Sequence, residues 1–335
     1  MAHGLLYGAS FTNGVLSFTD KQGRTICNVH LRNYLTLTAT EDNSSVALTK
    51  VGTLSNEFEV NVGSGWTAYE FGTVIPLNAG ESCKWRCKSH PTTQDYSNYV
   101  QFVMTGTIEA SGNVNSMLSS DFENITSISV YSHAFRSLFK DCTSLTQAPS
   151  LPATILASNC YYSMFYGCTS LTQAPSLPET VLALGCYASM FSNCTSLTQA
   201  PSLPATVLAS DCYNSMFMNC TSLTQAPSLP ATILASDCYN SMFRDCTSIT
   251  QAPSLPAITL ESGCYKSMFN GCTSLAEVRI AATKESTATD ALVYWLSGVS
   301  ATGDFYCDPN ATIFPTGASG IPEGWTRHNI ADYPN

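Results

Sequence analysis

The stretch CTSLTQAPSLPATILASNCYYSMFYG, residues 142–167, recurs through the middle of the chain, once at every twenty-sixth position. Two cysteines in each copy keep this spacing without insertion or deletion. The first series is Cys142, Cys168, Cys194, Cys220, Cys246 and Cys272, and the second is Cys160, Cys186, Cys212, Cys238 and Cys264. A fixed period of this length is typical of a solenoid, in which each coil buries its apolar face against the next coil. We therefore predict a repeat array over residues 142–275.

Each copy divides into two halves. In the second half, helical spacing puts four residues on one stripe: Leu156, Cys160, Met164 and Cys168. The first half, residues 143–148, is followed by Pro149 and is too short for a helix, so we predict a short strand there. Stacked strands lie about 4.8 Å apart and packed helices about 8–10 Å apart. The array is therefore predicted to curve into an α/β solenoid, a leucine-rich-repeat horseshoe with its strands inside.

The consensus resembles the repeat of BspA-type leucine-rich-repeat proteins. Phe139-x-x-Cys142-x-x-Leu145 followed by Pro149 matches its F-x-x-C-x-x-L…P pattern. The match recurs at Phe165/Cys168/Leu171, Phe191/Cys194/Leu197, Phe217/Cys220/Leu223, Phe243/Cys246/Ile249 and Phe269/Cys272/Leu275, and so covers the whole array. The resemblance implies surface binding or adhesion, in proteins of gut anaerobic bacteria and of their phages.

The flanking segments differ from the array in composition. Residues 1–33 contain two short apolar pieces, 14–18 and 25–29, that predict a hairpin, either at the edge of the next domain or as a docking segment. Residues 34–113 alternate in hydropathy, for example at 34–38, 58–62 and 99–103, and predict a small all-β sandwich. Residues 114–141 are interpreted as a transition with a degenerate capping repeat. Residues 276–335 are interpreted as a C-terminal cap with a helix at 289–296 and a strand at 304–307.

Composition disfavours several classes of protein. The net charge is −10 and charged residues make up 11% of the 335, so we expect no nucleic acid as partner. No apolar run approaches a membrane span, so we expect no membrane insertion. The first residues lack a basic region followed by an apolar run, so the general secretory route is not expected. We expect the 15 cysteines to remain thiols.

No residue pattern indicates catalysis, a cofactor or a metal. The five histidines are scattered, and the nucleophile, phosphate-loop and zinc-protease motifs are not found. Cys83-x-x-x-Cys87-x-x-His90 resembles half of a zinc site, but no second pair lies nearby, and we interpret the cysteines as packing residues. Trp66, Tyr69 and Trp85 form either an aromatic platform or, as we prefer, part of the core. We expect a protein that is not an enzyme.

Differences between the copies suggest where a partner binds. Two columns vary and are predicted to lie on the convex face, which makes Tyr162, Tyr166, Asn214, Met218, Asn240, Arg244, Lys266 and Asn270 the candidate contact residues; Ala188 and Ser192 complete the columns. The alternative is a uniform concave ladder of Gln147, Gln173, Gln199, Gln225 and Gln251, beside matching threonines. Free drift of exposed positions also explains the variable columns.

The function that these features favour is binding or structure. Our first expectation is a phage virion component, such as a head or tail fibre, decoration or receptor-binding protein. Its partners would be other virion proteins or a protein or glycan on the host surface, and a homo-oligomer is compatible with the sequence. The alternative is a bacterial cell-surface adhesin, located on the cell and not on the virion. Repeats determine a scaffold and not its ligand.

Overall fold

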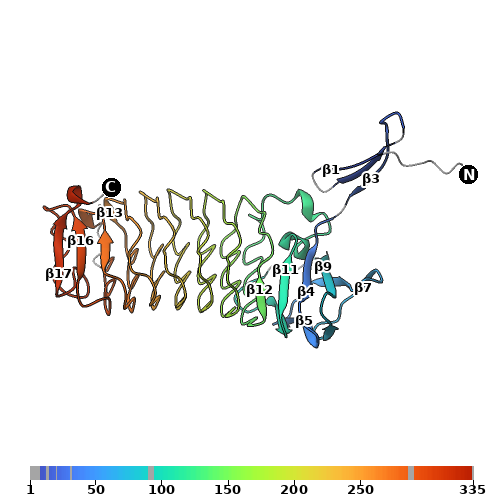
Figure 1. The fold of residues 1–335 in the computed structure, drawn as a ribbon, viewed down its shortest axis with the longest axis horizontal. Helices are drawn as coiled ribbons and strands as arrows, with labels where there is room; N and C mark the ends of the chain where they lie inside the picture. The colour runs from blue at the N-terminus through green and yellow to red at the C-terminus, as the bar shows by residue number, and fades with distance from the viewer. Residues whose placement is uncertain are drawn as a thin grey trace, which may run out of the picture.

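The computed structural model describes residues 8–12, 15–19, 21–30, 32–89, 94–285 and 290–333. The regular secondary structure of this part of the chain is mostly strand, with almost no helix. Its helical segments are three short 3₁₀ turns: η1 (Val114–Met117), η2 (Phe122–Asn124) and η3 (Ile330–Asp332). The described strands form five separate sheets, which are seen along the molecule in Figure 1.

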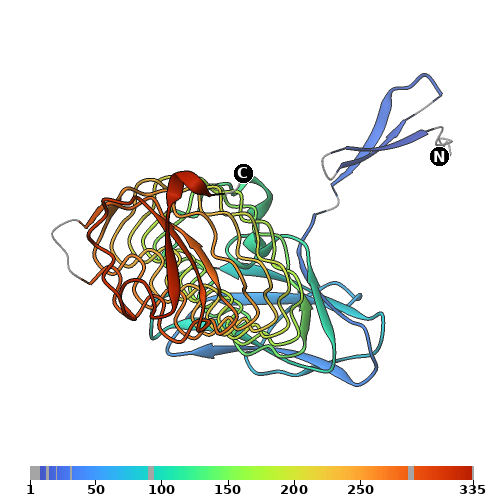
Figure 2. The same cartoon turned by 60° about the vertical axis from the view of Figure 1, so that its left-hand side comes forward.

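The first sheet is antiparallel and lies near the N-terminus. It consists of β1 (Gly8–Thr12), β2 (Val15–Thr19) and β3 (Thr25–His30), in the order β1-β2-β3. The predicted hairpin is confirmed, since β2 pairs with β3, and β1 adds a third strand. Figures 1 and 2 both show this sheet projecting away from the rest of the molecule.

Two larger sheets follow. One contains β5 (Ser44–Val51), β8 (Ile75–Leu77) and β10 (Tyr99–Thr105), in the order β10-β5-β8. The other contains β4 (Leu35–Ala39), β6 (Glu57–Asn61), β7 (Trp66–Ala68), β9 (Ser82–Ser89), β11 (Ile108–Ser111) and β12 (Leu145–Gln147), in the order β12-β11-β4-β9-β6-β7. The strands predicted at 34–38, 58–62 and 99–103 are therefore confirmed, with small differences at their ends.

The two larger sheets share one apolar core. Every second residue of β4 and of the first part of β9 is buried, as the alternating hydropathy predicts. Trp85 of β9 is fully buried, and its ring lies 5.1 Å from that of Phe102 of β10 and 4.7 Å from that of Tyr69. Trp66 instead lies half-exposed under Arg86. Trp85 and Tyr69 are thus packing residues, and the three aromatic residues do not form one exposed platform.

The predicted helix in each repeat is wrong: residues 159–167 form successive tight turns. The amide N–H groups alternate between two kinds of partner. Those of Tyr162, Met164 and Tyr166 donate to the carbonyl oxygen three positions earlier. Those of Tyr161, Ser163 and Phe165 donate to the carbonyl oxygens of Cys186, Ala188 and Met190, which belong to the next repeat. Alternate backbone donors therefore tie each repeat to the following one.

Backbone dihedral angles explain why no helix forms. Every fourth residue in this half of the repeat has a positive φ, as at Asn159 (54°), Ser163 (52°) and Gly167 (72°). Asparagine, aspartate and glycine adopt this left-handed conformation more readily than other residues. The three rows occupy this region throughout the array: Asn159, Gly185, Asp211, Asp237 and Gly263; Ser163, Ser189, Ser215, Ser241 and Ser267; Gly167, Asn193, Asn219, Asp245 and Gly271. A left-handed residue at every fourth position interrupts any α-helix.

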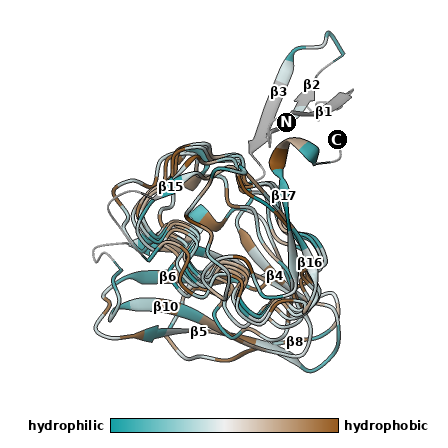
Figure 3. Ribbon diagram, turned by 90° about the vertical axis from the view of Figure 1, so that its left-hand side faces the viewer, coloured by the Kyte–Doolittle hydropathy of each residue, from teal (hydrophilic) through white to brown (hydrophobic). Residues whose placement is uncertain are grey.

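The interior of the array consists of columns of identical side chains, one from each repeat. Phenylalanine rings stack at centroid distances of 5.5–5.7 Å from Phe139 to Phe269, and tyrosine rings at 5.7–6.0 Å from Tyr161 to Tyr265. Since turns and not helices form this side, the wide helix spacing that predicted the horseshoe curvature does not arise. Residues 142–275 form a nearly straight row (Figure 1), and the repeats superimpose in the end view of Figure 3.

The array continues directly into the sheets on both sides. At its start, the ring of Phe102 stacks on Phe139 at 5.3 Å, and β12 of the first repeat pairs with β11. At its end, the ring of Trp295 stacks on Tyr265 at 6.4 Å.

The predicted helix at 289–296 is also wrong, because residues 291–296 form turns and Tyr294 has a φ of 56°. The C-terminal strands are β13 (Thr259–Leu260), β14 (Glu277–Arg279), β15 (Lys284–Glu285), β16 (Gly303–Cys307) and β17 (Trp325–Asn329). The strand predicted at 304–307 is β16.

Candidate functional site

The variable columns lie on the turn side of the array, and their exposure is uneven. Ala188 and Ser192 are buried, at 4% and 0% exposure. Arg244 is exposed, and the remaining members are half-buried: Tyr162, Tyr166, Asn214, Met218, Asn240, Lys266 and Asn270. The prediction of a freely exposed face therefore holds at Arg244 and not at the two small residues.

Several candidate contact residues are held by neighbours within the chain. The amide Nδ2 of Asn214 donates to Asp211 at 3.0 Å, and its Oδ1 accepts from Ser215 at 2.8 Å. Asn240 makes the same two bonds one repeat later. The guanidinium of Arg136 lies 4.3 Å from the ring centroid of Tyr162. These side chains have fixed orientations, which lowers the entropic cost of binding a ligand.

The glutamine ladder lies on the opposite edge and is exposed along its length. Isolated parallel bridges join Gln173 to Gln199 and Gln251 to Glu277, so strand pairing there is short. A shallow groove of about 430 Å³ runs between Gln199 and Gln225. Because its lining repeats from one coil to the next, this groove offers a periodic polar surface and no distinctive chemistry.

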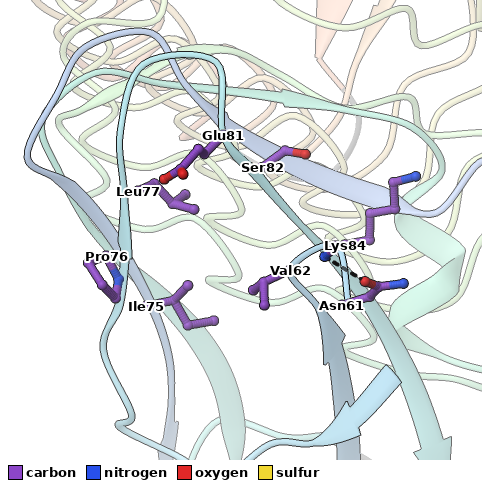
Figure 4. Close-up of a pocket in the computed structure, with 9 residues that line it drawn as sticks. Asn61, Val62, Ile75, Pro76, Leu77, Glu81, Ser82 and Lys84 are labelled. Atoms are coloured by element: carbon purple, nitrogen blue, oxygen red, sulfur yellow. Dashed lines mark hydrogen bonds between the residues drawn. The ribbon is translucent and has the colours of Figure 1, made fainter. Parts of the chain in front are cut away.

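A larger hollow lies outside the array, in the N-terminal sheets. It has a volume of about 680 Å³ and is open to solvent. Figure 4 shows Ile75, Pro76 and Leu77 of β8 on one wall with Glu81 next to Leu77, and Val62 opposite with Lys84 on the same side. Its lining is mainly apolar with one acid and one base, and nothing in it favours one class of ligand.

A smaller notch opens where the second repeat departs from its neighbours. The variable column reads Tyr162, Ala188 and Asn214 in successive repeats, so a small residue lies between two larger ones. The notch has a volume of about 280 Å³, and Tyr96 from the segment before β10 forms one side of it. Two of the predicted contact residues, Tyr162 and Asn214, thus meet at this notch. Sequence reasoning missed Tyr96, because its position beside the second repeat depends on tertiary packing.

Sequence reasoning also missed a row of exposed apolar residues. Ile155, Val181, Val207 and Ile233 are 54%, 75%, 52% and 58% exposed and occupy equivalent positions in four repeats. The signal was available, since each of these copies has Ile or Val between a threonine and a leucine. A row of this kind is a larger apolar feature than singly scattered surface residues.

The cysteine columns are structural. The 14 cysteines from Cys83 to Cys307 are free and buried. The thiol of Cys220 donates to the carbonyl oxygen of Phe191, 29 residues earlier in the chain, at 3.1 Å, and Cys168, Cys194, Cys246 and Cys272 make equivalent bonds. Burial raises the pKa of Cys194 to about 12 and of Cys272 to about 12, so neither forms a reactive thiolate at neutral pH.

The described residues contain no group of three or more histidine, cysteine, aspartate or glutamate side chains arranged to hold a metal ion. Of the half zinc pattern, Cys83 and Cys87 are buried in β9, and His90 lies outside the described residues. The described residues also contain no helix with the length and apolar character that crossing a lipid bilayer requires. No protein-family model, curated protein or solved structure matches the chain.

Proposed function

We propose that the protein is a non-enzymatic binding and structural protein whose repeats form a leucine-rich-repeat solenoid. In this proposal residues 142–275 are the solenoid, a small β-sandwich within 34–113 precedes it, and residues 276–335 close its other end. The coils consist of turns and short bridges, so the solenoid is straight and contains no helices. The observation that carries the proposal is the continuity of the inter-repeat hydrogen bonds and ring stacks from Phe102 to Trp295.

A continuous interior leaves the surface as the functional part of the molecule. Each coil is held by its neighbours on both sides, so the array is stiff and supports side chains at fixed spacing. The residues with the most strongly altered pKa values are thiols and tyrosines inside the columns, where no substrate reaches them. These features support a scaffold that presents a contact surface, and they supply no catalytic group.

We further propose that the protein is a component of a phage virion: a head or tail fibre, a decoration protein or a receptor-binding protein. Support comes from the many free thiols, which fit assembly in a reducing compartment. A stiff array with an N-terminal sheet that projects from it also suits a part that is anchored at one end. The second candidate, a bacterial surface adhesin, rests on the resemblance of the repeat to BspA-type proteins.

Immunogold electron microscopy distinguishes the two locations. An antibody against residues 142–275 is applied to purified phage particles and, separately, to intact cells of the bacterium. Labelling at a fixed position on the particle supports the virion component, and labelling of the surface of uninfected cells supports the adhesin. Labelling of neither would reject both locations. A hydrolytic activity of the purified protein that is lost on replacement of one carboxylate would reject the non-enzymatic proposal.

A further inference from the structure

The notch in the second repeat exists because two small residues meet there. The left-handed row reads Asn159, Gly185 and Asp211, and the variable column reads Tyr162, Ala188 and Asn214. Among these three repeats, the second thus has the smallest residue at both positions. A Cβ atom at Gly185 would meet the side-chain oxygen of Asn159, so a larger residue here would have to displace the Asn159 side chain.

Two tyrosine rings form the aromatic side of the notch. Tyr96 is 58% exposed, and its ring centroid lies 6.0 Å from that of Tyr162 with an angle of 79° between the rings. The guanidinium of Arg136 lies 4.4 Å from the centroid of Tyr96 and 4.3 Å from that of Tyr162. This shared cation–π contact holds both rings in place before any ligand arrives.

The opposite side of the notch is polar and also held in place. Asn214 uses one N–H to bond Asp211, and its carbonyl oxygen accepts from Ser215. An amide has two N–H donors and a carboxylate has two oxygens. One donor and one acceptor therefore remain side by side for a ligand, and the side chains of Asn159 and Ser189 add further polar groups.

The lining also restricts the charge and size of a ligand. Asp211 is the charged residue among those that line the notch, and the Arg136 guanidinium is already engaged by both tyrosine rings, so an anionic group would meet the like charge of Asp211 directly. The volume of about 280 Å³ lies near the lower end for ligand pockets, about 300 Å³. The ligand that fits is a neutral ring with an apolar face for the tyrosines and neighbouring hydroxyl groups for the amide and the carboxylate.

We infer that this notch binds a neutral hexose unit of a glycan. The inference rests on the proposed binding function and gives it a ligand class. A hexose carries neighbouring hydroxyl groups that each donate and accept, which matches the adjacent amide and carboxylate, and its ring face suits the tyrosines. A single sugar with one aromatic contact and a few hydrogen bonds is expected to bind with a dissociation constant of roughly 1 mM.

The test is ligand-observed saturation-transfer NMR with the full chain. The panel contains glucose, galactose, mannose, N-acetylglucosamine, N-acetylgalactosamine and their β-linked and α-linked disaccharides. We expect at least one of them to bind. Tyr96→Ala and Asn214→Ala should each weaken binding by about 5- to 10-fold. Asn240→Ala removes the same asparagine–aspartate pair one repeat further on, outside the notch, and should leave binding within about twofold.

A filling variant provides the second test. Ala188→Asn introduces the residue that the next two repeats carry in this column and should fill the notch, although Gly185 does not offer it the partner that Asp211 and Asp237 give the other two asparagines. We expect an unchanged circular dichroism spectrum and loss of sugar binding. No binding to any sugar of the panel, or binding that Tyr96→Ala and Ala188→Asn leave intact, would overturn the inference. So would a random peptide library that is retained by the wild type and released by these variants.

The two proposals fail separately. Particles that are labelled by the antibody while the purified chain binds no sugar would leave the virion proposal standing and reject the glycan site. Sugar binding without labelling of particles or cells would support the glycan site and reject both proposed locations.

Discussion

At Asn219, a turn structure and a helical structure of the repeat predict opposite effects of the same two substitutions on stability. It lies in the left-handed region with a φ of 61°. Alanine in this region costs about 1–2 kcal/mol, whereas glycine adopts it without steric cost but loses about 0.5–1 kcal/mol of backbone entropy. Both Asn219→Ala and Asn219→Gly remove the bond from Nδ2 of Asn219 to Oδ1 of Asn193 (2.8 Å). The difference in the free energy of unfolding between the two variants therefore reports the backbone conformation and not the lost hydrogen bond.

We expect Asn219→Gly to be more stable than Asn219→Ala by about 0.5–1 kcal/mol. In an α-helix the order reverses, and alanine is favoured over glycine by about 1 kcal/mol. The assay is equilibrium unfolding in urea, monitored by far-ultraviolet circular dichroism. The free energies of unfolding are compared with one shared m value, the slope of that free energy against urea concentration. A finding that the alanine variant equals or exceeds the glycine variant in stability would refute the turn structure of the repeats.

Asn270 is the matched control. It is half-buried in the last full repeat, lies outside the positive-φ positions, and its amide donates to the carbonyl of Ser267 at 3.1 Å. Here Asn270→Gly should be less stable than Asn270→Ala by about 0.5–1 kcal/mol, because glycine gains nothing sterically. If the glycine variant is the more stable at Asn219 and the alanine variant is the more stable at Asn270, the stability difference follows the local φ and not the residue type.

Three further predictions concern the interior. Phe217→Ala removes a fully buried ring with stacked neighbours on both sides, and should lower the free energy of unfolding by about 3–5 kcal/mol. As a control, Val207→Ala changes a residue that is 52% exposed and should alter the free energy of unfolding by less than about 1 kcal/mol. Urea unfolding measures both effects. Glu179→Gln should stabilise the protein more at pH 8 than at pH 4, because burial raises the pKa of Glu179 and only the charged carboxylate resists burial beside Tyr187. Urea unfolding at the two pH values checks this, and equal effects at both would contradict it. Above pH 9 the unfolded thiols ionise while the buried folded thiols stay protonated, so stability should fall by about 1.4 kcal/mol per thiol at pH 10, or by roughly 8 kcal/mol from six of them alone. Fluorescence-detected unfolding should then show a midpoint at or below about pH 10, and a chain that stays folded at pH 12 would contradict this prediction. These six are the thiols whose pKa burial raises from 9.0 to about 12: Cys83, Cys87, Cys186, Cys194, Cys238 and Cys272.

The hydropathy pattern predicted the buried residues correctly with an incorrect secondary structure. Leu156, Cys160, Met164 and Cys168 are buried, as the helical stripe requires. Turns that repeat at every fourth position return a side chain to the same face almost as the turns of an α-helix do. Hydropathy alone therefore does not separate the two structures. The composition of the rows through Asn159 and Gly167 does separate them, since each contains asparagine, aspartate and glycine alone from that point on.

The candidate site was predicted in part. Comparison of the repeats identified Tyr162 and Asn214 as variable and accessible, and both line the notch. The same comparison treated the small Ala188 as one more variable position, although it forms the floor. Tyr96 precedes the whole array in the chain, and no periodicity connects it to Tyr162. A site that joins a repeat to a non-repeating segment requires the tertiary structure, because the repeat pattern determines only contacts between equivalent residues.

The identity of the cysteine columns follows from two requirements that other residues do not meet together. The carbonyl oxygen of Phe191 accepts the amide of Cys194 and also the thiol of Cys220, and the sulfur atom is fully buried beside the phenylalanine rings. Alanine would fill less space and donate no bond, and serine would donate one but bury a more polar group in the same apolar column. Cysteine supplies a weak donor and apolar volume at once. The array therefore depends on reduced thiols for its packing, because a disulfide or an oxidised sulfur would remove both the donor and the apolar volume from the column.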